Sequence, residues 1–154
     1  MAEPLHPVPP AAEWRRLIPH AGAMCLLDEL VAWDDASIHL RATSHRRPDH
    51  PLRSDGVLRA LHLCEYGAQA MAVHGGLLAR AAGGIAAPGY LVSLRAVEFA
   101  VERIDDLAHA LDVHAERLLG GDDGWQYAFR VAHAGEPLAH GRAAVIVRGE
   151  AAPR

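Results

Sequence analysis

The stretch that decides the fold lies between Arg59 and Arg80 and reads A-L-H-L-C-E-Y-G-A-Q-A-M-A-V-H-G-G-L-L-A. It is rich in alanine and leucine, which favour helices, and it contains no proline. The pair Gly83-Gly84 comes after it, and glycine commonly ends a helix. Asp55 precedes it and can cap a helix N-terminus. The sequence therefore predicts one long helix over Gly56–Ala82.

The segments on either side of this helix have the apolar pattern that is typical of strands. In Ser37–Thr43 the apolar residues alternate with polar ones, and the preceding segment Met24–Trp33 is mostly apolar. We expect these two segments to form a hairpin around Asp34-Asp35-Ala36. Four further strands are predicted after the helix, at Tyr90–Ala100, Ala108–Leu119, Trp125–Ala134 and Leu138–Val147.

The predicted order is two strands, one long helix and four strands. Because the helix is apolar on most of its sides, it must be covered on most sides. A strongly curved antiparallel sheet wrapped around the helix would provide this cover. The sequence thus predicts an α+β protein with the hotdog fold, a curved antiparallel sheet around one long central helix. We expect the packed side of the helix to consist of Leu61, Cys64, Ala68, Met71, Ala72, Gly75 and Leu78.

Length and composition fit one folded domain. The chain has 154 residues, of which 51% are hydrophobic and 22% are charged, as in an ordinary globular protein. Residues 1–10 include four prolines, and we expect them to form a flexible leader. Residues 149–154 are expected to be a short tail, which leaves a single domain over residues 11–148.

Charge and residue usage argue against several classes of function. The net charge is −4 and no basic run occurs, so nucleic-acid binding is not expected. All fifteen basic residues are arginine, which excludes a catalytic lysine. The two cysteines, Cys25 and Cys64, lack metal-ligand spacing, and no HExxH motif is present, so we expect no metal. Without a signal peptide or an apolar membrane span, we expect a cytoplasmic protein.

Glu65 is the only Asp, Glu, Lys or Arg between Arg59 and Arg80. Gln69 lies one helical turn further on, so the two side chains should be neighbours. A carboxylate on a mostly buried helix costs free energy unless it is paired or protonated, and a protonated carboxyl group can act as a general acid. The alternative is an exposed or hydrogen-bonded Glu near the positive end of the helix dipole. This stretch alone leaves both interpretations open.

Among the eleven histidines, His50 is the candidate base. It lies in the long polar loop Ser44–Asp55 before the helix, and functional groups are often carried by such loops. Histidine is also suited to proton abstraction near neutral pH. His45 in the same loop is a second candidate. His62, three residues before Glu65, is expected to have a structural role.

Three segments resemble a known family. Leu17-Ile18-Pro19-His20 followed by Met24–Glu29 is similar to an L-P-H and then L-L-V-D-R opening. Glu65-Tyr66-Gly67-Ala68-Gln69 is similar to an E-x-x-A-Q motif on a central helix, and Tyr90 through Phe99 is similar to the strand pattern after that helix. In this order they resemble the 3-hydroxyacyl-[acyl carrier protein] dehydratases. The run Glu65–Gly75 further resembles the dehydratase-like proteins of aryl-polyene biosynthesis clusters.

The resemblance implies a reaction and a set of site residues. In the family, a loop histidine removes a proton from C2 of the acyl chain, and a helix carboxylate protonates the departing 3-hydroxyl. His50 and Glu65 match these positions, and we expect Gln69, Gly56 and Val57 to bind the substrate. The resemblance also implies that no cofactor takes part.

The resemblance further implies the partners. We expect an acyl carrier protein that delivers the 3-hydroxyacyl thioester, and a homodimer or a heterodimer with another hotdog protein. In that dimer, His and Glu come from different subunits and the acyl chain lies in a tunnel at the interface. Arg46, Arg47 and Arg53 are candidates for contact with an acidic carrier.

The loop around His50 departs from the family pattern. The family's His is followed by F-P-G, whereas His50 is followed by Pro51-Leu52-Arg53, and Gly56-Val57 lies further from Glu65 than expected. The family's Gly after the His, which helps to present backbone N–H groups to the thioester oxygen, has no counterpart directly after His50. Two alternatives stay open: a non-catalytic hotdog subunit that pairs with an active dehydratase, and a hotdog acyl thioesterase in which Glu65 activates water.

Overall fold

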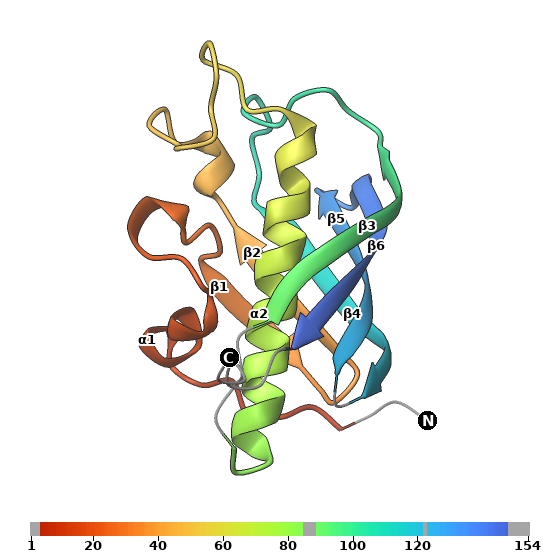
Figure 1. The fold of residues 1–154 in the computed structure, drawn as a ribbon. Helices are drawn as coiled ribbons and strands as arrows, with labels where there is room; N and C mark the ends of the chain where they lie inside the picture. The colour runs from red at the N-terminus through yellow and green to blue at the C-terminus, as the bar shows by residue number, and fades with distance from the viewer. Residues whose placement is uncertain (1–3, 85–88, 122, 148–154) are drawn as a thin grey trace, which may run out of the picture.

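Residues 4–84, 89–121 and 123–147 are described by the structure, a computed structural model. A six-stranded antiparallel sheet, in the order β1-β2-β4-β5-β6-β3, curves around the long helix α2 (Figure 1). The predicted α+β hotdog fold is thereby confirmed. The strands and the main helix are β1 (Glu29–Trp33), β2 (Ser37–Ala42), α2 (Leu63–Ala81), β3 (Gly89–Phe99), β4 (Leu111–Gly121), β5 (Gly124–His133) and β6 (Glu136–Val147).

The shorter helices lie before β1 and around the loop that leads into α2. They are α1 (Ala11–Trp14), η1 (Arg15–Leu17), η2 (Gly22–Met24), η3 (Ser44–Arg46) and η4 (Ala60–His62). The hairpin predicted between the first two strands is confirmed, with a register that pairs Trp33 with Ile38. No helix within the described ranges is long and apolar enough to cross a membrane.

The predicted start of the long helix is wrong by seven residues, because α2 begins at Leu63 and not at Gly56. Asp55 is not its N-cap. Asp55 (φ +54°) and Gly56 (φ +74°) form a tight turn whose flanking residues Ser54 and Val57 exchange two backbone hydrogen bonds, of 2.9 and 3.0 Å. Both central residues have positive φ, which is the geometry of a hairpin turn and excludes a helix at this point.

The segment between this turn and the helix is extended because its backbone groups find partners in another loop. The Leu58 carbonyl accepts a hydrogen bond from the Ile104 N–H, and the Ala60 N–H donates to the Glu102 carbonyl, both at 2.9 Å. The Leu58 N–H donates to Oδ1 of Asp105. These long-range bonds satisfy groups that would otherwise pair within a helical turn.

The first strand is also shorter than predicted, since Met24–Asp28 lies outside β1. In this segment, backbone groups of Met24 and Leu26 form hydrogen bonds with the side chain of Gln69 and not with a neighbouring strand. Oε1 of Gln69 accepts the Leu26 N–H at 2.9 Å, and its Nε2 donates to the Met24 carbonyl at 2.7 Å. The other strands begin and end within three residues of their predicted bounds.

The prediction of the packed side of the helix is wrong. Leu61 is 63% exposed, and Cys64, Ala68, Ala72 and Leu78 are only half-buried. The buried residues of α2 are Leu63, Tyr66, Gly67, Gln69, Ala70, Met71, Val73, His74, Gly76 and Leu77. Small apolar residues occur on every side of this helix, so the apolar pattern did not identify the side that faces the sheet. Cys64 and Leu78 are only half-buried but still pack against the core.

Two glycines allow the close packing of α2. A Cβ at Gly67 would lie 2.8 Å from the ring of Phe129 on β5, and a Cβ at Gly76 would lie 2.7 Å from the side chain of Leu17. Both separations are shorter than real Cβ atoms tolerate. The helix can therefore approach the sheet on one side and η1 on the other only because these two positions lack a side chain.

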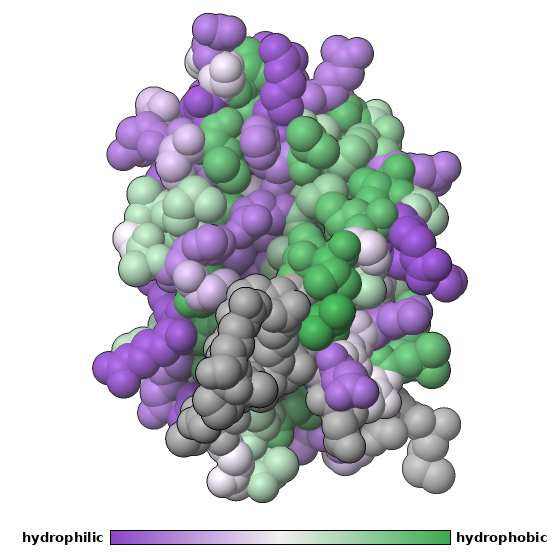
Figure 2. Space-filling view, in the orientation of Figure 1, coloured by the Kyte–Doolittle hydropathy of each residue, from purple (hydrophilic) through white to green (hydrophobic). Residues whose placement is uncertain are grey.

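The two edges of the sheet differ. Along β1, the His6 N–H donates to the Trp33 carbonyl at 2.9 Å, the indole N–H of Trp33 donates to the Pro7 carbonyl at 3.0 Å, and the His6 ring stacks on Trp33. At the other edge, β3 pairs only with β6 and exposes Val92 and Leu94, which are 52% and 39% exposed. Figure 2 shows this hydrophobic surface over β3. The domain bounds stay a prediction, with residues 1–3 and 148–154 outside the described ranges.

Candidate active site

Glu65 lies in the first turn of α2, and its side chain is 31% exposed. Its Oε1 accepts a hydrogen bond of 3.2 Å from Nε2 of Gln69, which is the neighbour that the sequence predicts. Nε2 of His20 also lies 3.2 Å from Oε1, at ion-pair distance. Within the described residues, no hydrogen bond or ion pair involves Oε2. One carboxyl oxygen is therefore held, and the other is available to a ligand.

Gln69 is only 1% exposed, and its amide group is fully used within the chain. Its carbonyl oxygen accepts the Leu26 N–H, while its two amide hydrogens go to Glu65 and to the Met24 carbonyl. This arrangement fixes Glu65 relative to the segment that precedes β1. Substrate binding by Gln69 stays a prediction, and it would require one of these bonds to open.

His50 is buried, with 4% of its surface exposed, and both of its ring nitrogens are hydrogen-bonded. Nδ1 accepts the Leu52 N–H at 3.1 Å, so the neutral ring carries its hydrogen on Nε2. Nε2–H then donates to the Tyr66 hydroxyl (3.2 Å), Tyr66 donates to Ser44 Oγ (2.6 Å), and Ser44 donates to the Leu26 carbonyl (2.8 Å). The backbone groups at both ends fix the direction of this chain of hydrogen bonds.

The structure does not bring His50 and Glu65 into contact within one chain. His50 faces Tyr66, the residue after Glu65, on the buried side of α2. Besides the adjacency of Tyr66 and Glu65 on α2, the backbone of Leu26 links the two sites, because its carbonyl accepts a hydrogen bond from Ser44 and its N–H donates to Gln69. A direct meeting of His50 and Glu65 thus requires groups from two subunits or a rearranged loop.

The other predicted site residues lie apart from Glu65. Gly56 and Val57 belong to the tight turn before η4, and neither is hydrogen-bonded to Glu65 among the described contacts. His45 is fully buried and donates Nε2–H to the Leu107 carbonyl at 3.0 Å. Substrate binding by Gly56 and Val57 stays a prediction.

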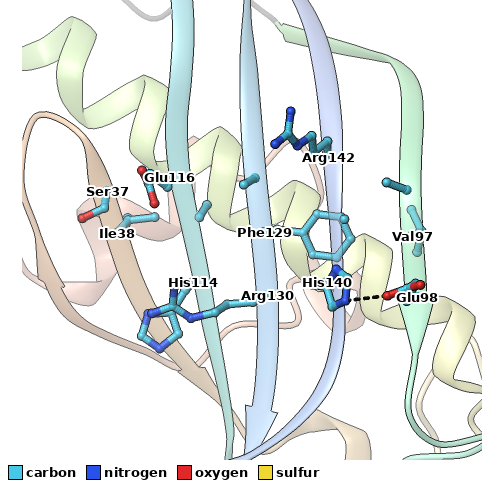
Figure 3. A pocket seen from close by; sticks show the side chains of 14 residues that line it. Ser37, Ile38, Val97, Glu98, His114, Glu116, Phe129, Arg130, His140 and Arg142 are labelled. Carbon is cyan, nitrogen blue, oxygen red and sulfur yellow. Dashed lines mark ion pairs between the residues drawn. The ribbon is translucent and has the colours of Figure 1, made fainter.

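The cavities of the single chain lie away from Glu65. The larger one, of about 750 Å³, is on the outer face of the sheet, where Glu116, Arg130 and Arg142 line it (Figure 3). A smaller one, of about 460 Å³, lies along β3 and β6. Neither cavity is lined by Glu65 or His50. Neither of these two cavities therefore places an acyl chain beside Glu65.

Comparison with known proteins gives the family. The chain matches the ApeP-like family, described as ApeP dehydratase, over residues 12–152. The chain belongs to the ApeP-like dehydratase family. No curated protein matches it.

Solved structures share the fold of this ApeP-like protein. A chain of the dehydratase heterocomplex ApeI:P from Xenorhabdus doucetiae is 24% identical, with a TM-score of 0.78 and coverage of 89% of this chain and 91% of that chain. A conserved protein from Pseudomonas aeruginosa is 16% identical, with a TM-score of 0.61 and coverage of 90% and 100%. A hypothetical thioesterase protein with coenzyme A from Streptococcus pneumoniae is 13% identical, with a TM-score of 0.58 and coverage of 80% and 88%.

Sequence reasoning did not give a site role to three residues of this ApeP-like dehydratase. His20 was part of the L-P-H motif, which was the signal that could have drawn attention to it. Tyr66 and Ser44 gave no signal, because only the fold brings the Tyr66 hydroxyl to His50 and the Ser44 hydroxyl to Tyr66. Across the described ranges, no group of three or more His, Cys, Asp or Glu side chains is placed to hold a metal ion.

Two buried histidines make the stability of the fold depend on pH. Burial lowers the pKa of His50 and that of His74 to about 4, against about 6.5 for an unfolded histidine. Between these pH values, the two histidines bind more protons in the unfolded chain than in the folded chain. Their contribution to the free energy of unfolding is therefore fully present above about pH 6.5 and is lost as the pH falls from about 6.5 to about 4. We expect a loss on the order of 2–3 kcal/mol for each ring across this window.

Urea unfolding at pH 7.5 and pH 5.0 measures this loss. The His74→Gln variant, which has no group that titrates in this range at position 74, should lose less stability than the wild type between the two pH values. Equal stability of the wild type at both pH values would show that these rings are not kept neutral by burial.

Proposed function

We propose that this ApeP-like protein dehydrates a 3-hydroxyacyl thioester on an acyl carrier protein to the trans-2-enoyl thioester, in fatty-acid-like or aryl-polyene biosynthesis. Membership of a dehydratase family supports the reaction class. The observation that carries the proposal is the half-exposed Glu65, which has Oε1 held by two neighbours and Oε2 unoccupied.

The chemistry requires an acid and a base. Glu65 donates its proton to the 3-hydroxyl group as the C3–O bond breaks, and the hydroxyl leaves as water. A base removes a proton from C2, and the electron pair of that C–H bond becomes the C2=C3 double bond. Oxidation states balance without an electron donor or acceptor, so the proposal includes no redox cofactor.

His50 is the proposed base, and its hydrogen bonds define how this is tested. A base needs a free lone pair, but Nδ1 accepts the Leu52 N–H and Nε2 carries the hydrogen bound to Tyr66. Opening the bond to Tyr66 would leave the hydrogen on Nε2, so His50 can act only if the bond from the Leu52 N–H to Nδ1 opens. If that bond stays closed, the base belongs to a partner subunit and this chain supplies the acid.

Two variants separate these cases. Tyr66→Phe keeps the His50 ring and removes only the partner of its Nε2–H, so it should keep activity if His50 is the base, whereas His50→Asn should abolish it. If His50 is only structural, both variants should lower thermal stability and leave the kcat of the folded protein near that of the wild type.

The proposed partner is a second hotdog chain, either a copy of this one or a homologue. Among the described residues, the edge strand β3 exposes Leu91, Val92 and Leu94, which form an apolar surface for such a partner. The likeness to a chain of the ApeI:P heterocomplex supports a hotdog partner. The proposed contact with an acidic carrier at Arg46, Arg47 and Arg53 remains a prediction. Arg53 is mostly engaged by backbone carbonyls, and Arg47 lies 3.5 Å from Asp28.

Leu94→Asp should prevent this pairing. A charge on the β3 edge would lie in the interface without a partner, and burying it would cost several kcal/mol. We expect the variant to sediment as a monomer at concentrations where the wild type is a dimer, whether with itself or with the added partner. Leu119→Asp, at an exposed leucine (66%) near the end of β4, is the matched control and should sediment like the wild type. Pairing by the Leu94 variant would place the interface elsewhere.

The proposed function is tested by mass spectrometry of a 3-hydroxyacyl carrier thioester incubated with the protein, alone and with a second hotdog protein. Loss of one water supports the dehydratase. Release of a free acid would instead indicate the thioesterase alternative. Activity only in the presence of the second protein would support the partner-subunit alternative.

A further inference from the structure

His20 is the only charged or titratable side chain within ion-pair distance of Glu65 among the described residues. Its Nε2 lies 3.2 Å from Oε1, the same oxygen that Gln69 binds. The two side chains approach Glu65 from different parts of the chain, His20 from the loop between η1 and η2 and Gln69 from α2 itself. Together they occupy Oε1 and leave Oε2 on the open side.

The backbone around His20 is fixed even though its ring is 43% exposed. Before it, Ile18 is 4% exposed and Leu17 packs against Gly76 of α2. After it, Met24 and Leu26 are bound by the buried Gln69. The ring is therefore held beside Glu65 by anchors on both sides in the sequence, which an ordinary surface histidine lacks.

We propose that His20 is a positioning residue for Glu65 in the dehydration step, an inference that rests on the proposed function. When Glu65 gives its proton to the departing hydroxyl, the O–H bond breaks and negative charge develops on the carboxyl group. The His20 ring faces that charge at Oε1, where a fixed dipole or a positive charge stabilises the transition state. Its contact with Oε1 also directs Oε2, which delivers the proton, towards the substrate.

Kinetics of His20→Ala and His20→Gln test this proposal, with the partner present if the wild type requires it. We expect kcat of the alanine variant to fall by about tenfold or more with little change in KM, because misplaced groups act on the transition state. Added imidazole should restore part of the lost kcat, and the glutamine variant, which keeps a donor near the Nε2 position, should retain part of it. Neither recovery is expected if His20 is merely structural.

His140→Ala is the control, because it breaks another His–Glu pair, the exposed pair of His140 with Glu98 at 2.9 Å on the sheet. Its kcat should equal that of the wild type. Wild-type kcat in His20→Ala, or a loss that neither imidazole nor glutamine recovers, would overturn the proposal for His20. Absence of water loss by the wild type under all conditions would instead overturn the proposed function.

Discussion

Glu65→Gln should reduce dehydration by about 10³-fold, the contribution expected of a general acid. Glutamine has the size of glutamate and can still meet Gln69 and His20, but it has no acidic proton to give to the 3-hydroxyl group. The side chain is 31% exposed, so the fold should tolerate the change with little loss of stability. The measurement is kcat for water loss, followed by mass, together with the thermal midpoint of unfolding.

Glu116→Gln is the matched control for this variant. Glu116 is exposed on β4 and lines the outer cavity, away from Glu65. We expect wild-type activity from it. If Glu65→Gln kept more than about a tenth of the wild-type rate, Glu65 would not be the acid, because loss of a general acid costs more than this. The carboxylate would then be a structural partner of His20 and Gln69.

His74→Ala should destabilise the protein by about 3–5 kcal/mol, the largest stability effect that we expect from a single substitution. His74 lies on the opposite side of α2 from Glu65 and is fully buried. Its Nε2–H donates to the Asp34 carbonyl and its Nδ1 accepts the Tyr127 hydroxyl, both at 2.8 Å. Removing the ring leaves a cavity and deprives both groups of a partner.

The change in the free energy of unfolding is measured by urea denaturation at pH 7.5. In the variant the Tyr127 oxygen still accepts a hydrogen bond from Nε of Arg117 at 3.2 Å, but the Tyr127 O–H loses its acceptor and the Asp34 carbonyl loses its donor. His140→Ala, at a half-exposed ring, should change stability by no more than about 0.5 kcal/mol, as surface substitutions commonly do. Equal effects from both variants would mean that the His74 bonds contribute nothing beyond those of a surface histidine.

The hydrogen-bond partners of His74 and His50 could not be predicted from the sequence. The place of His74 opposite Glu65 on α2 follows from helical spacing alone. The sequence could not reveal that His74 bridges the β1–β2 turn to β5, because the partners Asp34 and Tyr127 are 40 and 53 residues away. For His50, the loop position suggested a base, whereas the fold uses the ring to connect the Leu52 backbone with Tyr66.

The pairing of Glu65 with Gln69 was predictable for the opposite reason. Residues four apart on a helix are neighbours wherever the helix lies, so the E-x-x-A-Q motif was sufficient to place them together. The contact of Glu65 with His20 was not predictable, although both belong to motifs that the sequence displays. It requires the loop between η1 and η2 to lie against the first turn of α2, and Gln69 and Gly76 hold it there through long-range contacts.

By itself, the sequence determined the order of elements, the hotdog fold and the position of Glu65 beside Gln69, because these depend on local propensity and on helical and strand periodicity. Only the tertiary structure decided where α2 begins, which of its sides is buried and which groups surround His50 and Glu65. Those outcomes depend on hydrogen bonds and packing between distant segments, such as Leu58 with Ile104 and Gly67 with Phe129. A local pattern cannot identify such partners, because the interactions that stabilise them form only when distant segments meet in the folded chain.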